Sequence, residues 1–140
     1  MSKAIKVLYT GKVHTAGARE NGTARSSDGR LDITLSPPGA AGSGTNPEQL
    51  FAAGWSACFE SAMGFAARKM RVALPAELAI DAEVDLCMSG VEFLLQARLN
   101  VSAPGMDLST AQAIVDAAHQ TCPYSKALRS NVDVEIAVVV

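Results

Sequence analysis

A long and almost uniformly apolar segment between residues 46 and 71 constrains the fold of this chain more than any other feature. It opens with a helix start signal, because Asn46 is a good N-cap residue, Pro47 suits the first helical position and Gln49 completes a capping box. We predict one helix from there to about Arg71, roughly 36 Å long. Large apolar residues fall on nearly all its faces: Leu50, Phe51, Trp55, Cys58, Phe59, Met63, Phe65 and Met70. Such a helix must be buried.

The rest of the chain predicts strands on either side of this helix. Residues 5–10 are rich in β-forming residues, Asp28-Gly29 is a hairpin turn signature, and residues 31–35 alternate between apolar and polar. After the helix we expect a hairpin of residues 78–88 and 91–101, helices over 109–120 and 122–128, and a closing strand over 132–140. This order predicts an α+β fold in a single domain over residues 1–140.

Composition excludes several classes of protein. Hydrophobic residues make up 49% of the 140 residues and charged residues 19%, which argues against disorder. A net charge of −2 and an aromatic content of 5% argue against nucleic-acid binding. Glu60, Arg68 and Lys69 interrupt the apolar helix, so we predict no membrane span. With no export signal at the start, we predict a cytoplasmic protein, in which a cysteine pair is expected to be catalytic or redox-sensing.

The three cysteines differ in their surroundings. Cys87 lies near the end of an alternating strand and is interpreted as a small apolar residue. Cys58 lies three turns inside the apolar helix, where a buried thiol has a raised pKa and little reactivity. Cys122 precedes Pro123 in an N-cap-like position, where backbone N–H groups and the helix dipole favour a thiolate. Local chemistry alone therefore favours Cys122 as a nucleophile.

A metal site is a weaker hypothesis. His119 stands three residues before Cys122 and could be grouped with Cys58 and Cys87. No second closely spaced pair of ligands supports this grouping, and structural zinc takes four ligands. We therefore predict no metal, and we expect His14 to be exposed on a polar segment.

Four stretches of the sequence form a more specific signal. They are Asn46 to Phe59 (NPEQLFAAGWSACF), Cys122 to Ala127 (CPYSKA), Arg19 to Gly22 (RENG) and Asn131 to Val134 (NVDV). In this order they resemble the organic hydroperoxide resistance proteins, a subfamily of the OsmC peroxidase superfamily, over essentially the whole chain. Two departures stand out: Trp55 where the family commonly has Tyr, and Ala18 where Gly is usual.

The resemblance implies antiparallel sheets wrapped around a long buried central helix in an intertwined homodimer, with active sites at the subunit interface. It implies that Cys58 is the peroxidatic cysteine and Cys122 the resolving one, which reverses the local preference. It implies that Arg19 and Glu48 hold Cys58 as a thiolate and orient the peroxide. The implied substrates are organic hydroperoxides, the implied reductant is a dithiol such as a lipoyl group, and no bound cofactor is implied.

These residue types suit that chemistry. Peroxide reduction needs a thiolate, and a guanidinium beside the sulfur stabilises the anion while a carboxylate orients the guanidinium. Glu48 and Cys58 are ten residues apart, about 15 Å along one straight helix. Either the helix breaks between them or a partner subunit supplies Glu48 and Arg19.

Candidate residues for an apolar substrate pocket also lie on this helix: Phe51, Trp55, Phe59 and Met63. They are equally what any buried helix would carry. Two other functions remain open, a redox-sensing or ligand-binding relative and a structural dimer with inert thiols. Arg19 together with Glu48 favours the peroxidase, because neither sensing nor packing needs an arginine held beside a thiol.

Overall fold

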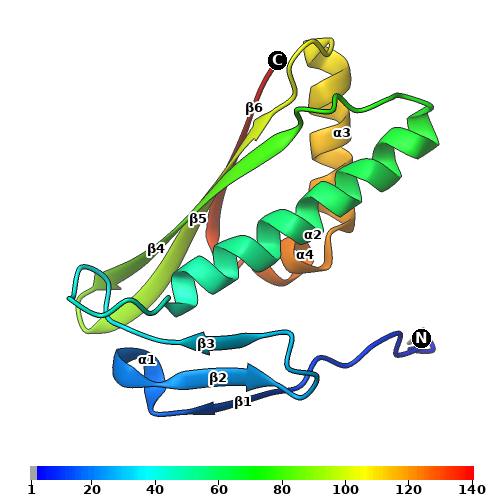
Figure 1. The fold of residues 1–140 in the computed structure, drawn as a ribbon. Helices are drawn as coiled ribbons and strands as arrows, with labels where there is room; N and C mark the ends of the chain where they lie inside the picture. The colour runs from blue at the N-terminus through cyan, green and yellow to red at the C-terminus, as the bar shows by residue number, and fades with distance from the viewer. Residues whose placement is uncertain (1–2) are drawn as a thin grey trace. The chain divides into compact units, whose positions relative to one another are not determined.

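The computed structural model describes residues 3–140, and they form an α+β fold with one long helix, as predicted (Figure 1). The chain divides into two compact units, one ending at Pro47 and the other comprising Glu48–Val140. The expectation of a single functional domain over residues 1–140 stays a prediction.

The smaller unit is built on a three-stranded antiparallel sheet in the order β1-β2-β3. The predicted hairpin turn is confirmed: the Ser26 hydroxyl donates to Asp28 Oδ1 at 2.6 Å, and Gly29 takes a left-handed φ of 76°. The elements are β1 (Val13–Ala16), α1 (Ala18–Asn21), β2 (Thr23–Ser26) and β3 (Asp32–Thr34).

The prediction of a strand over residues 5–10 is wrong for the described chain, in which the first strand begins at Val13. Residues 5–10 have no hydrogen-bonded partner strand, and a β-rich sequence without one does not form a sheet. Ile5 and Leu8 consequently remain about nine-tenths exposed, at 91% and 87%.

Helix α1 was not predicted. Its two ends have backbone conformations and close approaches that favour glycine. Gly17 enters it with a φ of 83°, and Ala18 also has a positive φ of 60°. A Cβ at Gly22, just after the helix, would collide with the carbonyl oxygens of Ala16 and Ala18. Position 18, where the resembling family usually has glycine, is therefore a position whose backbone conformation favours glycine.

The larger unit contains the long helix α2, which runs from Pro47 to Met70 as predicted. The hairpin, both shorter helices and the closing strand also lie where the sequence predicts them. They are β4 (Ala79–Ser89), β5 (Glu92–Ser102), α3 (Leu108–Thr121), α4 (Pro123–Leu128) and β6 (Asp133–Val139). The helices cover one face of the β4-β5-β6 sheet (Figure 1).

This sheet is mixed rather than wholly antiparallel. Strands β4 and β5 are antiparallel, whereas β5 and β6 are parallel. The reason is the connection, because α3 and α4 carry the chain back to the starting end of β5 before β6 begins, and parallel neighbours need such a crossover.

The core of the larger unit lies between this sheet and the helices. Strand β5 alternates, so that Ala97, Leu99 and Val101 are buried while Arg98 faces outward. The largest fully buried side chains are Trp55, Phe59, Met63, Leu99, Val101, Ile114 and Val115. The buried face of α2 thus anchors the unit.

Some large apolar side chains of α2 remain exposed in the described chain: Phe65, on the face that carries Cys58, is 62% exposed, and Met70, in the last turn, is 43% exposed. The sequence predicted a helix buried all round, and within one chain only one face is covered. Among residues 3–140, no helix is both long and apolar enough to cross a membrane.

Leu99 tests this description of the core. Replacing it with alanine leaves a cavity under α2, and the free energy of unfolding should fall by about 2–5 kcal/mol. Urea denaturation at matched protein concentration measures the change. Val139→Ala, at a position 63% exposed, is the control and should cost much less. Equal losses for the two variants would contradict the assigned core.

Candidate functional site

The larger unit brings two cysteines together. Cys58 lies in the middle of α2, and Cys122 is both the C-cap residue of α3 and the N-cap residue of α4. The two side chains are hydrogen-bonded to each other, and both are free thiols. The prediction of an N-cap position for Cys122 is confirmed, although its side chain makes no capping hydrogen bond.

Burial raises the pKa of the Cys58 thiol above its ordinary value, and the hydrogen bond with Cys122 and the charge of that group raise it further. The backbone N–H of Tyr124 donates to the sulfur and lowers the pKa by a smaller amount. Within this unit, therefore, Cys58 is a protonated thiol at neutral pH. Attack on a peroxide would require a neighbouring cation that stabilises the thiolate.

Access distinguishes the two thiols. Cys122 is completely buried, whereas Cys58 is partly exposed and lines a pocket of about 370 Å³. A molecule that enters this pocket meets the Cys58 sulfur and not Cys122. The pocket is lined by Cys58, Ser61, Ala62, Phe65, Ala66, Lys69, Ala117, Thr121 and Pro123.

None of the four predicted pocket residues lines this pocket. Trp55, Phe59 and Met63 are fully buried in the core, and the Phe51 ring packs edge-on against Tyr124 with centroids 6.4 Å apart. Apolar character alone predicted these residues, but it does not tell which face of α2 meets the core.

The missed lining residues carry a positional signal. Ser61, Ala62, Phe65, Ala66 and Lys69 follow Cys58 at helical spacing, so they share its face of α2. Counting along the helix from Cys58 would have found them.

The start of α4 is held on α2 around the two thiols. A Cβ at Gly54 would lie only 3.2 Å from the Tyr124 hydroxyl oxygen, so glycine lets the Tyr124 ring approach the helix. Next to it, Trp55 Nε1 donates a hydrogen bond of 3.1 Å to the Ser125 hydroxyl, and both residues are fully buried.

Arg19 and Glu48 belong to other parts of the chain than the two cysteines. Arg19 is in α1 of the smaller unit, and Glu48 is in the first turn of α2. Helix α2 is unbroken from Pro47 to Met70, so Glu48 is about 15 Å from Cys58 along the axis. A break in the helix, one of the two alternatives left by the sequence, is therefore excluded.

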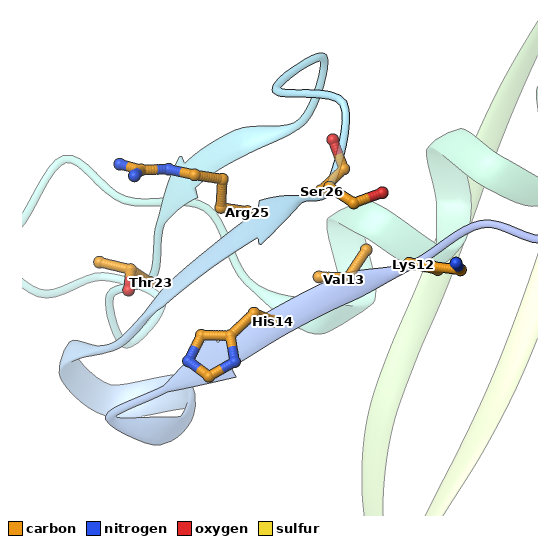
Figure 2. Close-up of a pocket in the computed structure, with 7 residues that line it drawn as sticks. Lys12, Val13, His14, Thr23, Arg25 and Ser26 are labelled. Carbon is orange, nitrogen blue, oxygen red and sulfur yellow. The ribbon is translucent and has the colours of Figure 1, made fainter.

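A second pocket, of about 460 Å³, lies in the smaller unit on strands β1 and β2 (Figure 2). It is lined by Lys12, Val13, His14, Thr23, Arg25, Ser26 and Ser27. His14 is exposed there, as predicted, and Arg25 pairs with Asp32 at 3.3 Å. The lining contains no thiol, so this pocket offers no redox-active nucleophile.

Within residues 3–140, no three His, Cys, Asp or Glu side chains converge on a point where a metal could bind. His119 does not join the two cysteines in such a group. Burial, with the nearby Arg129 guanidinium, lowers the pKa of His119, and its Nδ1 atom is buried without a hydrogen-bond partner in the described chain.

Comparison with known proteins places this chain in a family. Residues 39–137 match the family described as OsmC-like protein, and the chain belongs to that family. Its relatives narrow the assignment. An organic hydroperoxide resistance protein of Xanthomonas axonopodis pv. citri is 46% identical over 142 residues, which cover 99% of both chains. The chain is thus a member of the organic hydroperoxide resistance group within the OsmC-like family.

Solved structures agree with this assignment. The organic hydroperoxide resistance protein OhrB of Bacillus subtilis superposes with a TM-score of 0.89 at 40% identity, covering 95% of this chain and all of the other. One from Vibrio cholerae, with captopril bound in one of its active sites, has a TM-score of 0.87 at 38% identity, covering 97% and 95%.

The difference in access between the thiols predicts their order of alkylation. In a Cys87→Ser variant, iodoacetamide should modify Cys58 in the folded protein. Cys122 should react at least about a hundredfold more slowly, because its sulfur is reached only when the structure opens. Peptide mass spectrometry over a time course measures both rates, and urea should abolish the difference. Equal rates in the folded protein would contradict the described burial.

Proposed function

We propose that this protein is a cysteine-based peroxidase that reduces organic hydroperoxides to alcohols, without a bound cofactor. One observation carries the proposal: two reduced thiols are in contact, and only Cys58 faces a pocket. The names of the relatives supply the substrate class, since they are organic hydroperoxide resistance proteins. The mostly apolar lining of the pocket suits a peroxide with an alkyl or aryl group.

The proposed reaction has three steps. The Cys58 thiolate attacks the terminal, hydrogen-bearing oxygen of the hydroperoxide, the O–O bond breaks, and the alkoxide leaves as an alcohol after taking up a proton. Cys58 is then a sulfenic acid. The Cys122 thiol attacks its sulfur, an S–S bond forms, the S–O bond breaks and water leaves. A dithiol reductant restores both thiols by exchange and becomes a disulfide itself. From the family resemblance we propose that this dithiol is a lipoyl group.

Activation of Cys58 is the reason to propose a homodimer. The pKa of the thiol is raised within its own unit, so a cation must approach the sulfur before peroxide can be attacked. Arg19 is the cation that the resemblance assigns to this role, with Glu48 to orient it. Because Glu48 cannot reach Cys58 along its own unbroken helix, we propose that a second subunit supplies both residues.

The exposed Phe65 and Met70 side chains of α2 support the same assembly, because a second subunit would cover them. We also place the protein in the cytoplasm, where structural disulfides are rare and a thiol pair can cycle between its two states.

A redox-sensing or ligand-binding role is the second candidate. The raised pKa of Cys58 favours it, because a protonated thiol turns over slowly unless it is activated. Turnover separates the two. A peroxidase consumes many equivalents of cumene hydroperoxide when a dithiol reductant is present, whereas a sensor stops after about one equivalent per site.

The roles of the two cysteines predict distinct variants. Cys58→Ser should abolish peroxide consumption, because no other residue supplies the nucleophile. Cys122→Ser should consume one equivalent and then accumulate sulfenic or sulfinic acid at Cys58. Mass spectrometry of the peroxide-treated proteins identifies the oxidised residue. Oxidation that begins at Cys122 would instead support the nucleophile that local chemistry favours.

A shared site predicts complementation between inactive variants. Arg19→Ala and Glu48→Gln should each raise the pKa of Cys58 and lower activity at neutral pH by about a hundredfold or more. A heterodimer of either variant with a Cys58→Ser subunit should regain up to one working site. The measurement is peroxide consumption after subunit exchange, with exchange verified by native mass spectrometry.

Homodimers of each variant, mixed without exchange, are the control for this experiment. Activity that stays absent in verified heterodimers would show that the residues act within one chain. That result would contradict the shared site and leave the peroxidase proposal standing.

A further inference from the structure

Two contacts join α2 to the start of α4, and they have matching spacings. On α2, Trp55 and Cys58 are three residues apart and lie on one face. Cys122 and Ser125 are also three residues apart, at the N-cap and in the first turn of α4. Trp55 Nε1 donates a hydrogen bond of 3.1 Å to the Ser125 hydroxyl, and the thiols of Cys58 and Cys122 are hydrogen-bonded to each other. The two elements therefore meet at two points about one helical turn apart.

Burying the Trp55–Ser125 hydrogen bond removes two polar groups from water, and this desolvation costs free energy. Within residues 3–140, Ser125 is the one polar or charged residue that is fully buried. The indole N–H can only donate, so the serine hydroxyl is what satisfies it. Two apolar residues would fill this core without desolvating either group. What a buried polar pair adds is a fixed relative geometry.

Other contacts at the same place determine the height and tilt of α4 on α2. The Tyr124 ring lies against Gly54 and edge-on to Phe51, while the Tyr124 N–H donates to the Cys58 sulfur. The ring contacts are apolar, and a hydrogen bond to sulfur is weakly directional. These contacts therefore tolerate small displacements of α4 along α2. The Trp55 hydrogen bond is the directional contact, and it fixes the register of α4.

We propose that Trp55 and Ser125 are positioning residues for the second chemical step, an inference that rests on the proposed peroxidase function. By fixing α4, their hydrogen bond holds the Cys122 sulfur in line with the S–O bond of the Cys58 sulfenic acid. Cys122 then attacks, the S–S bond forms and water leaves. The competing reaction is attack of the sulfenic acid on a second peroxide, which yields a sulfinic acid and a second alcohol.

The partition between these two fates depends on alignment, because a small misplacement of reacting groups slows an intramolecular step strongly. The first step does not use Cys122, so it is independent of this hydrogen bond. A change confined to the second step is therefore the signature of positioning.

Ser125→Ala removes the acceptor with little change in volume. Its rate constant for attack on cumene hydroperoxide should stay within about twofold of the parent. Its rate constant for disulfide formation should fall by about tenfold, so Cys58 should reach the sulfinic state at a roughly tenfold lower peroxide concentration. Rapid quenching and mass spectrometry follow both steps. Emission of Trp55, the one tryptophan in the sequence, reports loss of the hydrogen bond.

Ser56→Ala is the matched control, because it removes a hydroxyl beside Trp55 that bonds only within α2, to the carbonyl oxygens of Ala52 and Ala53. It should alter neither step. Trp55→Phe removes the donor and gives an independent second variant. Adding Ser125→Ala to Trp55→Phe should slow disulfide formation no further, because the bond is lost only once. Near-UV circular dichroism verifies that each variant is folded.

Disulfide formation at the parent rate in folded Ser125→Ala would overturn the inference, as would an equal slowing of both steps. A parent protein whose Cys58 does not react with peroxide would instead contradict the proposed function. The two failures are thus separate observations.

Discussion

The packing of the buried face of α2 against β5 and α3 is the constraint on which the larger unit depends. Trp55, Phe59 and Met63 lie on that face and are fully enclosed, so they fix both the rotation of the helix and its depth. Rotation determines where Cys58 points. With the three large side chains turned inward, the cysteine is left at the border of the core, in contact with α4 on one side and with a pocket on the other.

Much of this arrangement could be predicted from the sequence, because its signals are local. The start of α2 at Pro47, the hairpin turn at Asp28-Gly29 and the alternation of β5 depend on neighbouring residues. The failures share a different cause. A strand over residues 5–10 needs a partner strand, which the local sequence does not identify. The parallel pairing of β6 depends on the path of the two helices that precede it.

The candidate site divides in the same way. The N-cap position of Cys122 was predictable, yet its complete burial was not, and burial removes it from the pocket that Cys58 lines. Trp55 was grouped with the pocket because it is large and apolar. Its hydrogen bond to Ser125, seventy residues away in sequence, is a tertiary contact that no local pattern encodes. Family resemblance, rather than local chemistry, supplied the proposed roles of the two thiols.

Cys122 is the joint between two helices, and this has a kinetic consequence. Its N–H donates to Ala118 O at 2.8 Å and its carbonyl accepts from the Lys126 N–H at 3.0 Å, so the backbone is tethered on both sides. The remaining freedom of the sulfur is rotation about χ1. Such a rotation is a smaller motion than a loop rearrangement, which takes nanoseconds to microseconds. In the proposed function, closing the thiol pair then needs a rotation of the Cys122 side chain, so disulfide formation should not wait for a rearrangement of the backbone at Cys122.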